Sequence, residues 1–516
     1  MPLTDRAAGI LLHPTCLSGP HGIGSLGPEA HAFIDALAEN GFRLWQILPL
    51  GPAGYGNSPY SGYSSFAGNP LLISLAPLLE KGRLREEDLA EEPAWPEGRV
   101  AFDAVAAWKL PILRIAHERF LSDGEEKAVR GYRRFCQAQA GWLDEYTLFM
   151  ALKTPRDGAP WMEWEAPLRR RAARALKAAA ECLAGEIDFH RFLQFLFDSQ
   201  WQALRAHCGE AGVKIVGDVP IFVPLDSAEV WTHQRLFHLD REGHPRKVAG
   251  VPPDYFTATG QLWGNPLYRW REHKKTGYAW WLDRLAHAFH HVDALRIDHF
   301  RAFEAYWEIP GGSPTAETGR WVKGPGADFL AKVEERFGAL PLMAENLGVI
   351  TPEVEALRER FHLPGMRVLH FAFGEEDPRH ATHAPHNHTP ESVVYTGTHD
   401  NDTTLGWFHG KDFDFDRRPE ALRATERRNL LAYLGTEDAS EIHWRLMRLA
   451  FGSVGRTAVA PIQDVLGLGS DARMNRPGTF RPDNWSWRLT SAQAARFRSP
   501  EVRDRLRELL WRYGRL

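Results

Sequence analysis

Residues 294–298 read Ala-Leu-Arg-Ile-Asp, a short apolar run that ends in a carboxylate. Similar runs, rich in apolar and β-branched residues and free of polar alternation, recur along the chain and stop at Gly, Pro, Asp or Asn. They span 42–50, 213–219, 294–298, 340–345, 366–373, 393–400 and 457–465. Runs of this kind are typical of strands buried on both faces of a parallel sheet.

Helical segments lie between many of these runs. Residues 329–337 and 352–360 are examples, because each spaces its polar positions as a helix with one solvated face does. Alternation of strands and helices over this length predicts an α/β fold, with a (β/α)₈ TIM barrel as the leading choice. A doubly wound parallel sheet is the alternative architecture.

Two regions interrupt the alternation. We expect residues 1–516 to form a single catalytic barrel with a mainly helical insertion at 76–212, whose helical periodicity is clearest from Ala101 onward. A second insertion, 225–281, is dense in Gly, Pro and aromatic residues and lacks periodicity. Long irregular segments in compact proteins are usually functional, so we expect an aromatic, loop-rich subdomain that lines a cleft.

Composition excludes several classes of protein. The 516 residues include 62 basic and 66 acidic ones, so the chain has the charge balance of a folded globular protein and no basic surface for nucleic acid or an anionic membrane. The four cysteines are widely spaced, and no apolar run is long enough for a membrane span or signal peptide. We therefore expect a cytoplasmic protein without disulfides.

Two motif-like signals are weak. Residues 22–27 match G-x-G-x-x-G, but the next strand ends Leu-Pro-Leu-Gly at 48–51 and lacks the acidic residue that a dinucleotide site needs. A tight loop before a helix at 28–40 is the simpler interpretation. Clustered histidines at 380–388 could bind a metal, but Pro385 and the absence of periodicity favour a polar loop at the rim of a site.

Acids fall where strands end. Asp218, Asp298, Glu345 and Asp400 each stand at or beside the end of an apolar run. One such acid would normally cap a helix or pair with an arginine, but four on separate strands of a barrel converge on its catalytic face. Carboxylates without a metal signature suit glycosidic bond chemistry. A Mg²⁺ site is the alternative, although no phosphate-binding loop accompanies the acids.

Tryptophan supplies a second indication of a sugar partner. The 19 Trp residues outnumber the 12 Tyr, and flat apolar rings suit the C–H faces of pyranoses. Helical Trp108, Trp142 and Trp201 are expected in the core. The Trp residues expected to lie near the cleft are Trp45, Trp263, Trp307, Trp485 and Trp487.

These residues resemble the motifs of the 4-α-glucanotransferases, the amylomaltases or disproportionating enzymes of the α-amylase clan. The resemblance runs from about His13 to about Leu489 and is weakest in the helical insertion. Its motifs, in chain order, are 45–52, 60–65, 250–256, 261–266, 296–301, 344–348, 397–401 and 480–485. One departure is Asn346, which stands where many relatives have Asp; we expect it to be neutral.

The resemblance implies a role for each matching residue. It implies Asp298 as the nucleophile, Glu345 as the general acid/base and Asp400 as the transition-state stabiliser. It further implies that Arg296 orients Asp298, and that 250–263 forms a loop over the cleft. The residues implied to bind substrate are Tyr60, Asp218, Asp254, Trp263, Arg296, His299, His399 and Asn401. Implied partners are maltooligosaccharides, amylose and other α-1,4-glucans, without cofactor or metal.

The predicted reaction is retaining transfer of an α-1,4-glucan segment through a covalent intermediate, which requires the two carboxyl groups about 5–5.5 Å apart. Three alternatives remain open. An α-amylase-type hydrolase would use the same acids, a silent glucan-binding protein would need only the aromatic cleft, and a metal-dependent phosphoryl-transfer enzyme would need a bound cation.

Overall fold

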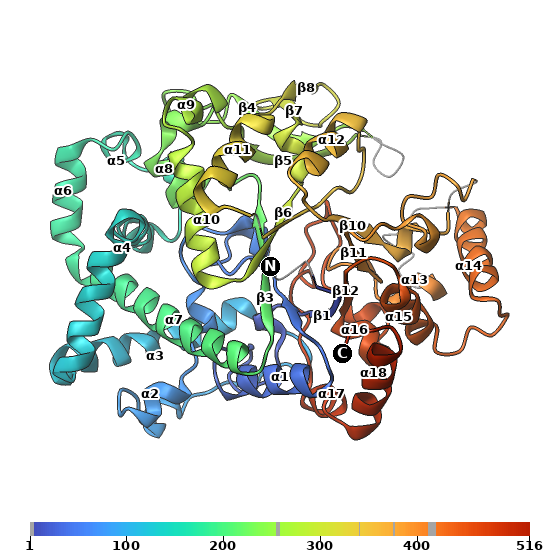
Figure 1. The fold of residues 1–516 in the computed structure, drawn as a ribbon. Coiled ribbons are helices and arrows are strands. Elements are labelled where there is room, and N and C mark those ends of the chain that lie inside the picture. Colours follow the sequence, from blue (N-terminus) through green and yellow to red (C-terminus); the bar gives the residue numbers. More distant parts are fainter. Residues whose placement is uncertain (1–4, 254–258, 340, 375–376, 411–418) are drawn as a thin grey trace.

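The fold is a closed barrel of eight parallel strands in the order β1-β12-β11-β10-β9-β6-β3-β2, surrounded by helices (Figure 1). This computed structural model describes residues 5–253, 259–339, 341–374, 377–410 and 419–516. The prediction of an α/β barrel is confirmed. Its strands are β1 (Ala7–Leu11), β2 (Leu44–Gln46), β3 (Lys214–Pro220), β6 (Ala294–Asp298), β9 (Leu342–Ala344), β10 (Gly365–Val368), β11 (Ser392–Tyr395) and β12 (Thr457–Pro461).

Several strands end earlier than their apolar runs. β11 stops at Tyr395, before the acid at position 400, and β12 stops at Pro461, where the chain continues directly as α16 (Ile462–Leu466). Proline has no N–H for the sheet, and its fixed φ suits the residue before a helix. The acid at position 400 therefore lies in the segment after β11, at the carboxyl end of the barrel.

The strand register places the ends of β3, β6 and β9 at the same height in the barrel. Asp218 of β3 pairs with Arg296 of β6, and Pro220 pairs with Asp298. On the other side of β6, Ile297 pairs with Ala344, so Asp298 and the residue after β9 end side by side. Parallel strands all present their carboxyl ends at the same face, which is where barrel enzymes carry their chemistry.

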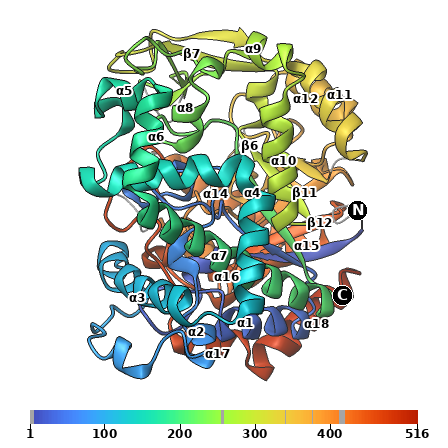
Figure 2. The same ribbon diagram turned by 90° about the vertical axis from the view of Figure 1, so that its left-hand side faces the viewer.

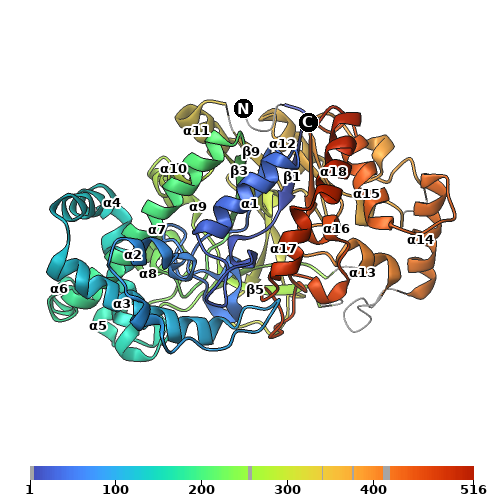
Figure 3. The same ribbon diagram turned by 90° about the horizontal axis from the view of Figure 1, so that it is seen from below.

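Most of the remaining helices cover the barrel. Figure 3, the view from below, shows α1 and α17 crossing the lower face, with α18 beside them. α12 matches its predicted range, and α11 begins three residues earlier than expected. These helices are α1 (Pro28–Glu39), α10 (Ala279–His291), α11 (Gly326–Phe337), α12 (Pro352–Arg360), α13 (Thr404–His409), α14 (Glu420–Leu434), α15 (Ile442–Gly452), α17 (Ser491–Phe497) and α18 (Pro500–Arg512).

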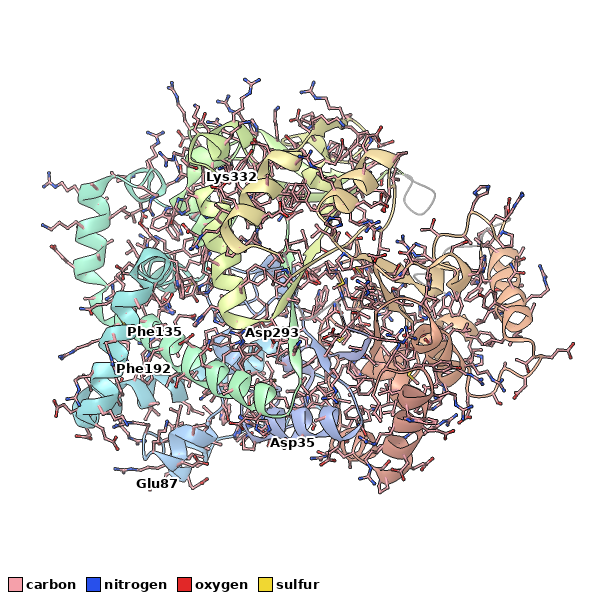
Figure 4. All side chains as sticks on the ribbon, viewed as in Figure 1. Asp35, Glu87, Phe135, Phe192, Asp293 and Lys332 are labelled. Atoms are coloured by element: carbon pink, nitrogen blue, oxygen red, sulfur yellow. The ribbon has the colours of Figure 1, made fainter. Side chains whose placement is uncertain are left out.

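Residues 76–210 are mainly helical and lie on the left of the barrel in Figure 1, the side that faces the viewer in Figure 2. The long helices pack through aromatic side chains, and the labelled Phe192 contacts Phe120 with ring centroids 5.0 Å apart (Figure 4). Trp201 is fully buried, as expected of a core residue. The helices are α2 (Ala76–Glu80), α3 (Phe102–Asp123), α4 (Glu126–Lys153), α5 (Ala166–Arg169), α6 (Ala173–Cys182) and α7 (Ala184–Glu210).

A four-stranded antiparallel sheet in the order β5-β4-β7-β8 lies above the barrel in Figure 1. The expectation of an irregular region at 225–281 missed its first two strands, and the sheet continues beyond that region to Lys323. Gly250 allows the strands to approach closely, because a Cβ there would lie 2.2 Å from the carbonyl oxygen of Gln261. The elements here are α8 (Ala228–Thr232), β4 (Lys247–Val251), β5 (Gln261–Pro266), α9 (Trp270–Lys275), β7 (Ala305–Pro310) and β8 (Arg320–Lys323).

None of the described helices is both long enough and apolar enough to cross a membrane.

Candidate active site

Arg296 joins two of the strand-end acids. Its guanidinium lies 2.6 Å from Asp218 Oδ2 and 2.9 Å from Asp298 Oδ1, and only 4% of the residue is exposed. Burial opposes the positive charge, but Asp218 and Asp298 together hold the pKa of Arg296 well above its usual range. Arg296 therefore stays charged, and it fixes the direction of the Asp298 carboxylate.

Tyr60 and His399 form the floor beside this pair. The Tyr60 hydroxyl donates to Asp218 Oδ2 at 2.9 Å and lies 3.0 Å from His399 Nε2. The rings of Tyr60 and His399 are stacked 5.3 Å apart, and Trp485 packs beside both. Burial raises the pKa of Asp218 to about 6. The result is a cluster of aromatic rings with polar groups at its edge, a combination that suits a sugar ring.

Glu345 is held by backbone groups of two loops. The His299 N–H donates to Oε2 at 2.7 Å, and the Leu347 N–H donates to Oε1 at 2.9 Å. The residue is 8% exposed, and burial raises its pKa to about 7, with the negative charge of Asp298 adding to the shift against the opposing charge of Arg296. A carboxyl group with this pKa can both give and take a proton near neutral pH.

Asp400 is held by a segment that the sequence did not indicate. The Asn475 side chain donates to Asp400 Oδ1 at 2.6 Å, and Arg473 Nη2 donates to the Asp400 carbonyl oxygen at 2.7 Å. His399 Nε2 lies 3.4 Å from Asp400 Oδ2. Asn475 and Arg473 sit in an irregular stretch after α16, where no periodicity or strand end marks them.

The remaining predicted binding residues differ in their surroundings. Trp263 is 38% exposed, and its ring meets the edge of His299 at 4.8 Å. Asn401 accepts hydrogen bonds from the Thr398 backbone and hydroxyl, so it shapes the turn that carries His399 and Asp400. Asp254 lies outside the described residues.

Two hollows adjoin the polar floor. One, of about 770 Å³, is lined by Tyr60, Asp218 and Phe222. The other, of about 420 Å³, is lined by His399 and Asn401. Each hollow is lined by one member of the Tyr60–His399 contact, whereas Asp298, Glu345 and Asp400 line neither hollow.

The tryptophans expected near the cleft divide into two groups. Trp263 and Trp485 lie beside His299 and Tyr60, as proposed. Trp45 does not: it is fully buried, and its indole N–H donates to the Leu12 carbonyl oxygen at 2.8 Å. Trp307 donates to the Ala316 carbonyl oxygen in the antiparallel sheet, and Trp487 is buried.

The weak signals have structural explanations. His388 is tied to Ser453 and to the His383 carbonyl oxygen, and His383 in turn accepts from the Val368 N–H. Across the described ranges, no three His, Cys, Asp or Glu side chains are grouped as a metal site requires. In the glycine-rich loop, Gly24 packs against the Pro14 carbonyl, where a Cβ would lie at 2.0 Å.

Asn346, the departure from the resembling family, has two partners. It accepts from the Met366 N–H at 2.8 Å and donates to Glu355 Oε1 at 2.7 Å. It therefore joins the end of β9 to β10 and α12.

Comparison with known proteins gives a consistent result. A family profile described as 4-alpha-glucanotransferase matches residues 12–493. The chain is 51% identical over 514 residues to a 4-alpha-glucanotransferase of Thermus thermophilus, covering 98% of each chain, and 48% identical over 489 residues to one of Synechocystis sp., covering 94% of each. The amylomaltase from Streptococcus agalactiae, solved in complex with acarbose, superposes with a TM-score of 0.92 at 36% identity, covering 99% of this chain and 100% of that one. With these matches added to a barrel whose strand-end acids meet at one face, the chain belongs to the 4-alpha-glucanotransferase family, the enzymes also known as amylomaltases.

Proposed function

We propose that the enzyme transfers α-1,4-glucan segments by retaining double displacement. Asp298 attacks the anomeric carbon of the donor while its bond to the leaving chain breaks and Glu345 gives a proton to the departing oxygen. Glu345 then takes the proton of an acceptor 4-hydroxyl, whose oxygen displaces Asp298 from the anomeric carbon. One observation carries this proposal: a buried Glu345 with a pKa of about 7 shares the site with Asp298, whose carboxylate is held by Arg296.

The charges around Glu345 support its two successive roles. While Asp298 is a carboxylate, its charge raises the pKa of Glu345 and keeps the proton needed for the first step. Once Asp298 becomes an uncharged ester, that contribution disappears and the positive charge of Arg296 still lowers the pKa. The same carboxyl group therefore changes from acid to base as the intermediate forms.

The pH dependence of the first step follows from this pKa. Only protonated Glu345 can assist the leaving chain, and its pKa in the free enzyme is about 7. We expect kcat/KM for the donor to be highest below pH about 7 and to fall about tenfold per unit above it. Initial rates on maltotriose at a series of pH values measure this alkaline limb of the pH profile, the fall in kcat/KM above pH about 7. A profile that stays flat well above pH 8 would remove Glu345 from the role of acid.

Substrate contacts are assigned in the same proposal. Asp400, supported by Asn475, grips sugar hydroxyls, and the stacked Tyr60 and His399 form the surface for the reacting ring. The other residues proposed to bind glucan are Asp218, Asp254, Trp263, Arg296, His299 and Asn401. The expected loop over 250–263 is wrong at both ends, because Gly250 and Val251 lie in β4 and Gln261 to Trp263 lie in β5. The half-exposed Trp263 favours an acceptor sugar over water at the intermediate, because water that is excluded from the site cannot hydrolyse the intermediate.

Transfer and hydrolysis give different products from one substrate. With maltotriose alone we expect chains longer than the substrate together with shorter ones, because a second maltotriose accepts the segment. Thin-layer chromatography of the mixture over time separates them. Glucose and maltose without any longer chain would instead favour an α-amylase-type hydrolase, the competing function for this set of acids.

Wider features belong to the proposal as well. We propose one catalytic unit over 1–516, in which 76–212 and 225–281 are insertions and the latter lines the cleft. We also propose a cytoplasmic enzyme that binds maltooligosaccharides, amylose or other α-1,4-glucans, uses no cofactor and has no nucleic-acid or membrane partner. The balanced charge and the four free cysteines support this assignment.

A further inference from the structure

Arg301 is a buried arginine with an unusual set of partners. It lies in the 3₁₀ turn Phe300–Phe303, directly after the Asp298 segment, and is 4% exposed. Nη1 donates to the Val349 carbonyl oxygen, and Nε donates to the Ala305 carbonyl oxygen at 3.4 Å. The guanidinium also lies 3.7 Å from the ring centroid of Trp321. Burial lowers the pKa of Arg301, because removing a charged group from water costs free energy.

The loops that Arg301 contacts are those that hold Glu345. The Glu345 carboxylate receives one N–H from His299, after β6, and one from Leu347, after β9. Asn346 already ties the loop after β9 to β10 and α12, and the Phe300 N–H donates to the Glu345 carbonyl oxygen at 3.2 Å. His299 has a φ of +53°, a conformation that a residue with a side chain rarely adopts, so its N–H needs further support to keep its direction. A contact that joins the outer parts of both loops adds to the restraint on the two donors.

Arg301 makes such a contact. It stands two residues beyond His299, and its hydrogen bond to Val349 reaches two residues beyond Leu347, so one guanidinium joins the two loops. Trp321 covers the guanidinium and itself packs edge-on against Trp307, its partner across β7 and β8, at 5.2 Å. Figure 1 shows β7 and β8 above β6, so the antiparallel sheet forms the outer wall of this arrangement.

We propose that Arg301 is a positioning residue for Glu345: backed by Trp321, it locks the loops after β6 and β9 so that the His299 and Leu347 N–H groups stay aimed at the acid. The inference rests on the proposed role of Glu345. Under this proposal Arg301 affects proton transfer by Glu345 and does not contact the substrate.

The test compares two donors that differ in their need for an acid. The sugar that leaves maltotriose would depart as an alkoxide and must be protonated, whereas the fluoride of α-maltotriosyl fluoride leaves with little help. For Arg301→Met we expect kcat on maltotriose to fall about 10- to 100-fold at nearly unchanged KM, since misplacement of a catalytic group by about 1 Å has effects of this size. Single-turnover release of fluoride should change less than about threefold. Arg301→Lys keeps the charge but loses the planar guanidinium, so its kcat on maltotriose should lie between those of the wild type and Arg301→Met.

Both donors are measured on one preparation, so the ratio of rates does not depend on how much of a variant is folded. Equal losses on the two donors, or no loss on maltotriose, would overturn the inference. Glu345→Gln serves as the reference: if it shows no donor dependence, the proposed role of Glu345 is what fails. Arg336→Met is a control for the loss of an arginine next to an aromatic ring: Arg336 lies exposed on helix α11, 5.6 Å from the Phe337 ring, and its replacement should leave both rates unchanged.

Substitutions of Trp321 test the same proposal independently. Trp321→Phe keeps an aromatic face over Arg301 and should retain most of the maltotriose activity, whereas Trp321→Ala should reproduce the donor-dependent loss of Arg301→Met in weaker form. If the Phe and Ala variants behave alike on both donors, the aromatic support of Arg301 is excluded.

Discussion

Replacement of Asp298 by Asn is expected to lower glucan transfer by at least about 10,000-fold, the scale of loss when a catalytic nucleophile is removed. The amide cannot attack the anomeric carbon, but it preserves the shape of the side chain. Arg296 keeps its contact with Asp218, so the floor of the site should remain ordered. Transfer from maltotriose is followed by product analysis, and binding of maltooligosaccharide is followed by calorimetry. Measurable binding with lost transfer is the expected pair of results; substantial surviving transfer would contradict the assignment.

Replacement of Glu345 by Gln should lower transfer from maltotriose by about 100- to 10,000-fold, the usual contribution of a general acid/base. The amide still accepts from one backbone N–H but carries no transferable proton. The alkaline limb near pH 7 should also disappear, because the group that titrates is gone. Rates on maltotriose across pH, compared with the wild type, measure both effects. A variant that keeps the same limb would assign that titration to another residue.

Local sequence patterns predicted much of the barrel. The run 294–298 coincides with β6, and the polar spacing at 352–360 coincides with α12, because both depend on periodicity within one segment. The antiparallel sheet could not be found in this way, since β4 pairs with β7, more than fifty residues away, and a bulge interrupts its pairing with β5. Pairings between distant, irregular strands leave little local signal.

The residues of the site likewise divide into those that local sequence patterns predict and those that only the folded chain reveals. Asp298 and Glu345 could be predicted because Asp298 ends β6, Glu345 follows β9, and the carboxyl ends of barrel strands lie at the face that carries the active site. Asn475 reaches Asp400 from an irregular segment, so only the folded chain brings the two together. Trp45 was misplaced because an indole satisfied by the Leu12 carbonyl in the core has the same sequence appearance as one in a cleft.

Arg301 shows what the strand-end pattern leaves out. The acids indicate the chemistry, but the accuracy of proton transfer depends on backbone N–H groups at His299 and Leu347, which carry no signature in the sequence. A buried arginine that joins two loops is visible only once those loops are placed. Under this proposal the antiparallel sheet helps to hold the acid.

The central claim is the covalent intermediate on Asp298, and trapping it is the most direct measurement. In Glu345→Gln, α-maltotriosyl fluoride should load the enzyme because fluoride needs little acid assistance, while the missing base slows release. Intact mass spectrometry should then show a gain of one maltotriosyl group, and peptide mapping should locate it on Asp298. Attachment of the sugar to any other residue would contradict the account.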